Sequence, residues 1–261
     1  MNESVLGKLA GRLAAGGEVL CAWVTANELA VAEWLAREAF DAVALDMQHG
    51  AIDLDGAMRS ILTVALAGKP TIVRVPVGAF ALASQLLDAG ASGILAPMIN
   101  SGDDARRLVD FVKFPPLGQR SWGPRTALPL SGLEATAYLK AANAMTQAIA
   151  MIETRAALDA LDDILAVEGV DGVFVGPSDL SIALSGGASV KPRGEALMTE
   201  ARRVAERAKA HRKYAAMFCF DGADAGAMLA LGYRLCTLAT DHSLMRAAAQ
   251  AELAAARAGR P

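Results

Sequence analysis

The sequence is poor in cysteine: it has only Cys21, Cys219 and Cys236, and no two of them form a CxxC pair. This absence excludes the usual zinc-finger and dithiol redox sites, which need paired cysteines at short spacing. Each cysteine lies alone inside an apolar run, in VLCAWV, AMFCF and RLCTL. We therefore expect three buried thiols that pack as small hydrophobic side chains in a reducing compartment.

Long apolar runs and an excess of positive charge are also missing. No apolar run approaches the ~20 residues that a membrane-spanning helix requires. Lys8 and Arg12 interrupt the apolar stretch near the N-terminus, which is unlike a signal peptide. The formal net charge of −3 gives no basic field for nucleic acid or for an anionic membrane. The sequence predicts a cytoplasmic protein with neither nucleic acid nor a membrane as its partner.

Short apolar runs alternate with amphipathic stretches along the whole chain. Runs rich in Val, Ile and Ala, each followed by a helical stretch, are typical of buried parallel strands. Eight such repeats within ~250 residues predict an α/β fold, a single (β/α)8 or TIM barrel over residues 1–261. A doubly wound open sheet usually has a glycine-rich turn after its first strand, and Val24-Thr25-Ala26-Asn27 is no such turn. The expected strands are 19–24, 42–46, 71–75, 93–97, 148–152, 172–176, 214–218 and 234–238.

Two segments stand outside this repeat. Residues 113–146 form the longest stretch without a strand and contain four prolines. A long loop in a compact domain is usually functional, so this one could fold over the active rim of the barrel or pack against a partner subunit. The C-terminal helix, expected over 241–257, could pack against another subunit or be exchanged with it.

Polar residues stand at the ends of four expected strands. Asp46 ends one strand, with His49 three residues later, and Arg74 lies one residue from the end of the next. Glu153 and Asp179 follow two further strands. Because the strands of a parallel barrel all end at the same rim, we expect these five side chains to lie close together.

Glu153 and Asp179 form the candidate metal site. Hard cations such as Mg²⁺ bind one or two carboxylates together with water and substrate oxygens. The alternative is that either residue caps the helix that follows it, for which the Ser178-Asp179 pair is well suited. The presence of Arg74 and His49 on neighbouring strands favours the metal.

Arg74 lies inside an apolar strand, where an unpaired charge would be costly, so it needs a partner. That partner is either a structural carboxylate or an oxyanion of the substrate. Among the three histidines, His49 is the preferred general base. His211 lies in a charged helix and is expected to be solvated, and His242 is expected in a helix-capping region at the rim.

No lysine follows an expected strand, and Lys69 and Lys213 precede theirs, which places them at the opposite face. A Schiff-base aldolase needs a desolvated lysine in the mouth of the barrel. Covalent imine chemistry is therefore excluded, and a metal ion must supply the electrophile.

Several of these runs together resemble a known family, the metal-dependent pyruvate aldolases that include 4-hydroxy-2-oxoheptanedioate aldolase. The resemblance extends over most of the chain, and its motifs are specific in combination. The runs that carry it are LDMQHGAIDL, TIVRVPV, LLDAGASGILAPM, AMIETRAALDALDDIL and VDGVFVGPSDLS.

The resemblance implies a hexamer that reversibly cleaves a 4-hydroxy-2-oxo acid to pyruvate and an aldehyde. By the same resemblance, Glu153 and Asp179 are ligands of a divalent metal, which we expect to be Mg²⁺, Mn²⁺ or Co²⁺. Arg74 corresponds to the residue that holds the keto oxygen of pyruvate. His49 corresponds to the base, with Asp46 as its supporting carboxylate.

Asp88, in LLDAGA, matches an aspartate that in the family assists the histidine from a neighbouring subunit. It is expected at the end of a helix, at the foot of its own barrel, so it could act only across an interface. A solvated turn aspartate is the alternative. Backbone N–H groups around Gly176, Pro177 and Ser178, at the start of a helix, are expected to hold the substrate carboxylate.

Two positions depart from the family pattern, because many members have glutamate where Gln48 stands and glutamine where Met151 stands. Both changes leave the metal site in place and leave the substrate and metal preference open. Two other functions also stay open. A metal-enolate lyase acting on an acyl-CoA thioester could use the loop with Arg120 and Arg125, whereas a non-catalytic binder of a metal-chelated keto acid would not need His49.

Overall fold

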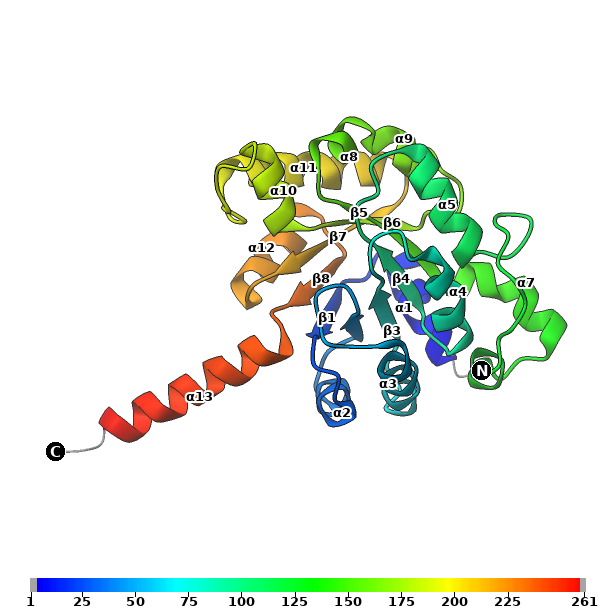
Figure 1. Cartoon of the computed structure of the whole chain (residues 1–261), viewed down its shortest axis with the longest axis horizontal. Coiled ribbons are helices and arrows are strands. Elements are labelled where there is room, and N and C mark those ends of the chain that lie inside the picture. Colours follow the sequence, from blue (N-terminus) through cyan, green and yellow to red (C-terminus); the bar gives the residue numbers. More distant parts are fainter. Residues whose placement is uncertain (1–3, 259–261) are drawn as a thin grey trace.

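The computed structural model describes residues 4–258 and shows a closed barrel of eight parallel strands. The strands pair in the order in which they occur along the chain, and β8 pairs back to β1 (Figure 1). The single-domain (β/α)8 fold expected from the sequence is confirmed. The strands are β1 Val19–Val24, β2 Ala42–Asp46, β3 Thr71–Arg74, β4 Gly93–Ala96, β5 Gln147–Ile152, β6 Gly172–Val175, β7 Tyr214–Cys219 and β8 Leu235–Leu238.

Helices surround the barrel and connect each strand to the next (Figure 1). They are α1 Val5–Ala14, α2 Leu29–Arg37, α3 Leu54–Leu66, α4 Phe80–Asp88, α5 Gly102–Val112, α6 Ala127–Ser131, α7 Ala135–Met145, α8 Arg155–Asp159, α9 Leu161–Ala166, α10 Pro177–Leu184, α11 Glu195–Ala210, α12 Gly222–Leu231 and α13 Asp241–Ala258.

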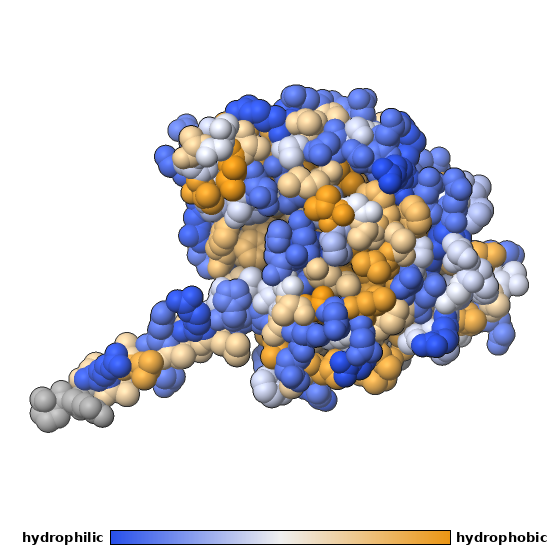
Figure 2. Space-filling view, viewed as in Figure 1, coloured by the Kyte–Doolittle hydropathy of each residue, from blue (hydrophilic) through white to orange (hydrophobic). Residues whose placement is uncertain are grey.

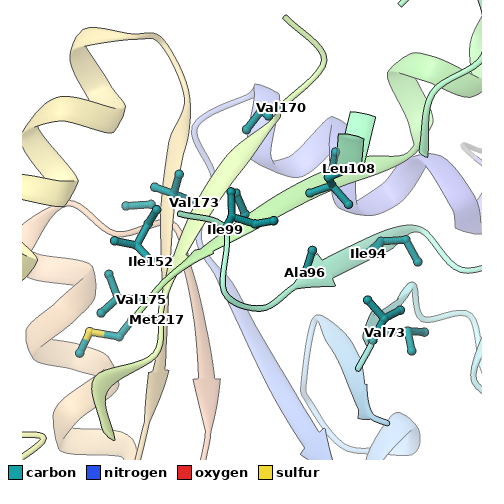
Figure 3. Packing of buried hydrophobic residues seen from close by; sticks show 14 of the residues in the cluster. Val73, Ile94, Ala96, Ile99, Leu108, Ile152, Val170, Val173, Val175 and Met217 are labelled. Atoms are coloured by element: carbon teal, nitrogen blue, oxygen red, sulfur yellow. The ribbon is translucent and has the colours of Figure 1, made fainter. Parts of the chain in front are cut away.

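Both faces of the strands are covered, which explains why they read as continuous apolar runs. In β5, Ile152 packs in the cluster between strands and helices (Figure 3), and Met151 packs in the cluster inside the barrel. Successive side chains of a strand point to opposite faces, so Glu153 continues the inward row that contains Met151. The same alternation turns Asp46 and Arg74 inward from β2 and β3. Three charged side chains therefore point into the mouth of the barrel.

The segment 113–146 is anchored at the amino ends of the strands. Lys113 is buried, and its Nζ donates to the carbonyls of Asn143 and Thr146, at 2.8 and 2.5 Å, and to Asp171 Oδ2 at 2.7 Å. Thr146 and Asp171 directly precede β5 and β6. The alternative that this segment folds over its own active rim is therefore wrong, because α5 returns the chain to the opposite end of the barrel before the segment begins. Packing against a partner subunit stays a prediction.

The C-terminal helix α13 extends away from the barrel (Figure 1). Only its first residue, Asp241, is buried, and every residue from 242 to 258 is exposed. In Figure 2 the projecting helix carries both hydrophilic and hydrophobic residues. Exchange of this helix between subunits stays a prediction.

The other expectations drawn from composition concern thiols and membranes. Cys21, Cys219 and Cys236 are all buried and free, as expected. Within residues 4–258, none of the helices has both the length and the apolar character needed to cross a membrane. The cytoplasmic location stays a prediction.

Candidate active site

A cavity of about 330 Å³ opens at the carboxyl ends of the strands and collects nearly all of the residues singled out from the sequence. Its charged and polar part comes from β2, β3, β5 and the β6–α10 turn, and its aromatic part comes from β1, β6, β7 and the segment after β7. A larger cavity of about 660 Å³ lies at the opposite end of the barrel and contains none of the candidate residues. The candidate residues that line the smaller cavity are Asp46, His49, Arg74, Glu153, Gly176, Pro177, Ser178 and Asp179.

Asp46 and Arg74 form a buried, two-pronged ion pair in this cavity. Arg74 Nε donates to Asp46 Oδ1 at 2.9 Å and Arg74 Nη2 donates to Asp46 Oδ2 at 2.6 Å. Asp46 also accepts from the Trp23 indole N–H at 3.3 Å and from the backbone N–H groups of Gln48 and His49, at 3.0 and 3.2 Å. Burial raises the pKa of Asp46, but Arg74 and the backbone donors outweigh it, so the pKa lies below its ordinary value.

Arg74 therefore has a structural carboxylate as a partner, the first of the two alternatives, and its contact with a substrate oxyanion stays a prediction. The expected pairing of Asp46 with His49 takes a different form, because Asp46 accepts from the backbone of His49. Within residues 4–258, no hydrogen bond joins Asp46 to the His49 ring. The guanidinium lies 4.9 Å from the Trp23 ring centroid, and its Nη1 has no hydrogen-bond partner among the described residues. Arg74 therefore keeps its Nη1 amino group for a ligand.

Glu153 is 2% exposed and accepts the Met98 N–H at 2.9 Å through Oε2. Met98 has a φ of 56°, a left-handed conformation that is uncommon outside glycine. Burial raises the pKa of Glu153 and the nearby charge of Asp179 adds to this, whereas the Met98 N–H and Arg74 oppose it. A Cβ atom on Gly176 would lie 2.5 Å from Glu153 Oε1, so only glycine leaves room for this carboxylate.

Neither Glu153 nor Asp179 caps the helix that follows it. Helix α10 begins after Gly176, with Pro177 in its first turn and without a side-chain cap, and Asp179 lies inside that turn. The helix after Glu153 is capped by Thr154, whose hydroxyl accepts the Ala157 N–H at 3.0 Å. Both carboxylates are therefore available to a ligand.

The donor set fits a hard divalent cation. Two carboxylates that repel one another at a buried position would be relieved by a positive charge between them. The part of the chain that the structure describes has no group of three or more His, Cys, Asp or Glu residues that could hold a metal. Such an ion would therefore take its other ligands from water and substrate, as Mg²⁺ commonly does.

The start of α10 offers backbone donors to a carboxylate, although not from every residue that the sequence suggested. The first N–H groups of a helix have no acceptor within it. Ser178 contributes such a group at this terminus, whereas Pro177 has no N–H and can only shape the turn. That this terminus holds a substrate carboxylate stays a prediction.

His49 lies on an exposed loop whose backbone is fixed on both sides. Its N–H is held by Asp46, as described above. A Cβ atom on Gly50 would lie 2.3 Å from the Asp46 carbonyl oxygen and 2.8 Å from that of Thr25, so this turn requires glycine. The imidazole reaches the cavity, and its ring nitrogens make no hydrogen bond to the described residues. It is free to exchange a proton with a ligand.

Asp88 lies outside the cavity, at the end of α4 and near the amino end of β4. It is not the solvated turn aspartate considered above, because Arg120 Nη2 donates to its Oδ1 at 2.6 Å. The Arg120 side chain is fully buried and lies 4.5 Å from the Phe114 ring centroid. A role for Asp88 in the site of a neighbouring subunit stays a prediction.

Aromatic residues in the cavity were missed by the sequence analysis. Trp23 meets Phe218 with a centroid distance of 5.4 Å and Phe174 with one of 6.0 Å, and Phe220 packs on Phe218 at 5.2 Å. Thr25, Met151, Thr240 and His242 also line the cavity. The alternation of β1, β6 and β7 could have placed Trp23, Phe174 and Phe218 inside the barrel. The apolar pattern of the sequence does not distinguish aromatic residues that line a cavity from residues of the hydrophobic core.

Comparison with known proteins shows the family of the chain. Residues 20–248 match the HpcH/HpaI aldolase/citrate lyase family. A hydroxypyruvate/pyruvate aldolase of Rhizorhabdus wittichii is 38% identical over 243 residues, which are 93% of this chain and 96% of that protein. A 2-keto-3-deoxy-L-rhamnonate aldolase of Salmonella gallinarum is 31% identical over 89% of this chain and 86% of its own length.

A solved structure shares the fold over almost the whole chain. It is an HpcH/HpaI aldolase/citrate lyase family protein from Burkholderia cenocepacia, with a TM-score of 0.87 and 31% identity, covering 96% of this chain and 99% of that one. The resemblance to pyruvate aldolases is thus confirmed, and the 4-hydroxy-2-oxoheptanedioate type stays a prediction. The chain belongs to the HpcH/HpaI aldolase/citrate lyase family and is an aldolase or lyase built on a (β/α)8 barrel.

Proposed function

We propose that the protein is a divalent-metal-dependent pyruvate aldolase that reversibly cleaves a 4-hydroxy-2-oxo acid to pyruvate and an aldehyde. The observation that carries this proposal is one cavity in which Glu153 and Asp179 face Arg74 and His49. No lysine is among the described residues that line it, so imine formation has no candidate nucleophile there. The hydroxypyruvate/pyruvate activity in the name of a relative supports pyruvate as the common product.

Glu153 and Asp179 would hold the metal ion. When bound, Mg²⁺, Mn²⁺ or Co²⁺ would supply Lewis-acid stabilisation of the negative charge that develops on the substrate oxygens. The backbone N–H of Ser178, at the start of α10, is placed to hold the substrate carboxylate.

Arg74 and His49 act on different atoms in the proposed reaction. The free N–H of Arg74 donates to the keto oxygen, where charge grows as the enolate forms. His49 takes the proton of the C4 hydroxyl, directly or through water, as the C3–C4 bond breaks. The bond electrons pass to the pyruvate enolate, the aldehyde leaves, and protonation at C3 gives pyruvate. Asp46 holds Arg74 in position, and its expected support of His49 stays a prediction.

The two other functions considered from the sequence receive less support. An acyl-CoA lyase was kept open by Arg120 and Arg125, but Arg120 is fully buried against Asp88 and cannot bind a nucleotide phosphate. Both arginines lie in the segment at the amino ends of the strands, far from the candidate active site. A pure binding protein would not need an imidazole in the cavity, so variants of His49 distinguish it from an enzyme.

Metal dependence is the direct test of this function. Full removal of divalent ions with EDTA is expected to abolish pyruvate release from 4-hydroxy-2-oxo acids, and Mg²⁺, Mn²⁺ or Co²⁺ is expected to restore it. A coupled assay for pyruvate measures the rate of cleavage after EDTA treatment and again after a metal ion is added back. Borohydride added with pyruvate should leave the enzyme active, because no imine forms. Full cleavage in a demonstrably metal-free preparation, or trapping by borohydride, would contradict the proposal.

We also propose that the protein is a homo-oligomer in which α13 packs on a second copy of the chain. Most of the stability of a protein helix comes from packing of an amphipathic face, and every residue of α13 after Asp241 is exposed, so the helix needs a partner surface. Met245, Ala249 and Leu253 recur every four residues and form one apolar stripe, and the first and last of these side chains are more than half exposed. The hexamer implied by the family is the expected assembly.

Charge placed on that stripe should disrupt the assembly. A chain carrying both Met245→Glu and Leu253→Glu is expected to sediment as a smaller species than the wild type, because the apolar contact would bury two carboxylates. The variant Ala251→Glu, which adds charge on the face of the helix opposite the stripe, is the control and should keep the native mass. A monomeric wild type, or a double variant of unchanged mass, would rule out this role of α13.

A further inference from the structure

One side of the candidate active site carries none of the groups assigned to the metal or to pyruvate. Glu153, Asp179 and Arg74 come from β5, the β6–α10 turn and β3, and under the proposed function they hold the pyruvate part of the substrate. The strands β7, β8 and β1 are neighbours in the barrel, and they and the segments that follow them supply Trp23, Thr25, Phe218, Phe220, Thr240 and His242. The aldehyde part of the substrate must therefore extend towards Phe218, Phe220, Thr240 and His242.

His242 is held firmly at this part of the cavity although its ring is 58% exposed. Its neighbour Asp241 is buried and accepts from the Thr25 N–H at 2.9 Å, the Thr25 hydroxyl at 2.6 Å, the Ala26 N–H at 2.9 Å and the His242 N–H at 2.8 Å. The chain enters this turn through Ala239, whose φ of 48° is left-handed. The first turn of α13 is thus attached to the loop after β1, at the rim.

The ring of His242 keeps a free hydrogen-bonding nitrogen. Thr240 Oγ1 lies 3.0 Å from His242 Nδ1 and 3.4 Å from His242 Nε2, and it donates to Ser243 Oγ at 2.8 Å. Because its hydrogen is directed to Ser243, the Thr240 hydroxyl can only accept from the ring, so the closer Nδ1–H donates to it. In a neutral imidazole Nε2 is then left as an acceptor for a ligand. The other polar group close to the ring is the Asp241 carboxylate, at 3.7 Å, and its oxygens are already engaged by four donors.

We infer that His242, supported by Thr240, is a specificity-determining residue that binds a hydroxyl group of the aldehyde, and that the preferred substrates are therefore hydroxyaldehydes. This inference rests on the proposed function. A carboxylate at the same place would lie beside the charge of Asp241, and Arg193, near Phe220, is already paired with Asp221 and Asp224. A hydroxyl group can donate to the free ring nitrogen, whereas an ionised carboxylate has no hydrogen to donate, and the nearby aromatic side chains can cover the carbon chain of the aldehyde.

The test measures kcat/KM for aldehydes added to pyruvate, in pairs that differ by hydroxylation. Glycolaldehyde is compared with acetaldehyde and glyceraldehyde with propanal, and glyoxylate serves as an anionic acceptor. His242→Ala is expected to lower the preference for the hydroxylated member of each pair by roughly 3–10-fold, the loss of one hydrogen bond. His242→Asn, which keeps a donor and an acceptor, should recover part of that preference. His211→Ala removes a half-buried histidine that follows α11 and pairs with Asp162, far from the cavity, so it is the control and should leave the preference unchanged.

The outcomes separate this inference from the proposed function. Wild-type protein should first show metal-dependent exchange of the pyruvate methyl protons with solvent, and absence of both exchange and addition would overturn the proposed function itself. With exchange present, an unchanged preference in His242→Ala overturns only the role of His242. Equal losses for every aldehyde would make the residue structural, and a loss confined to glyoxylate would mean that a carboxylate is recognised. Either result would overturn the hydroxyl assignment.

Discussion

Replacing Arg74 by alanine is expected to abolish both aldol cleavage and exchange of the pyruvate methyl protons, whereas replacing His49 by alanine should abolish cleavage alone. The enolate forms in both reactions, and Arg74 donates to the oxygen on which its charge develops. The C4 hydroxyl that His49 deprotonates is present only in the aldol. Loss of a positioned general base typically lowers the rate by ~10²–10⁴-fold. Proton exchange followed by NMR, beside cleavage rates, measures the two reactions separately.

A conservative change at Arg74 sharpens this prediction. Arg74→Lys should recover little, because a single ammonium cannot reproduce the two bonds to Asp46 and also donate to a ligand. Arg106→Ala removes an exposed arginine that pairs with Asp103 three residues earlier, and it should leave both reactions unchanged. Cleavage at the wild-type rate in His49→Ala would show that another group is the base. Binding of pyruvate with neither cleavage nor exchange in the wild type would favour the non-catalytic alternative.

Glu153→Gln and Asp179→Asn should weaken metal binding and cleavage together. Each variant keeps the shape of the side chain and removes one of two negative charges. The loss of metal affinity should therefore be electrostatic in origin. A bound metal ion is worth several kcal/mol to such a transition state, and we expect cleavage to fall by roughly 10³-fold. Isothermal titration with Mn²⁺ measures binding independently of activity. Wild-type affinity for Mn²⁺ in either variant would exclude that carboxylate as a ligand.

Replacing Glu153 by glutamine should not lower the thermal stability of the metal-free protein. The folded-state pKa of Glu153 lies above its ordinary value, chiefly because of burial, so ionising this carboxyl at neutral pH disfavours folding. Metal-free Glu153→Gln should therefore melt at least as high as metal-free wild type, and its advantage should grow as the pH rises towards neutrality. A markedly lower melting temperature would instead indicate that Glu153 has a structural role.

Much of the barrel could be predicted because its strands are buried on both faces and short. The apolar runs at 19–24 and 42–46 match β1 and β2 to the residue, and the alternation of side chains turns Glu153 and Arg74 inward. What the sequence could not supply is the register between strands. The structure pairs Asp46 with Arg74 across β2 and β3, and this register places the carboxylate where it accepts from the guanidinium.

Other features depend on contacts between distant segments and have no local signature. The place of residues 113–146 depends on Lys113 reaching the starts of two later strands. Likewise, the need for Gly176 appears only when Glu153 is seen against it. Asp88 could be placed at the foot of the barrel from its position in a helix, but its bond to Arg120 joins positions 32 residues apart.

One side of the cavity, formed by β7, β8 and β1, can change its amino-acid sequence separately from the rest of the site. The residues that face the acceptor come from β7, β8 and β1, whereas the carboxylates and Arg74 come from other strands. Mutations at positions such as Phe218, Phe220 and His242 can therefore accumulate, or be sampled in a combinatorial library, without displacing the groups that form the nucleophile. We expect directed evolution towards new carbon skeletons to succeed most readily when randomisation is confined to that one side of the barrel.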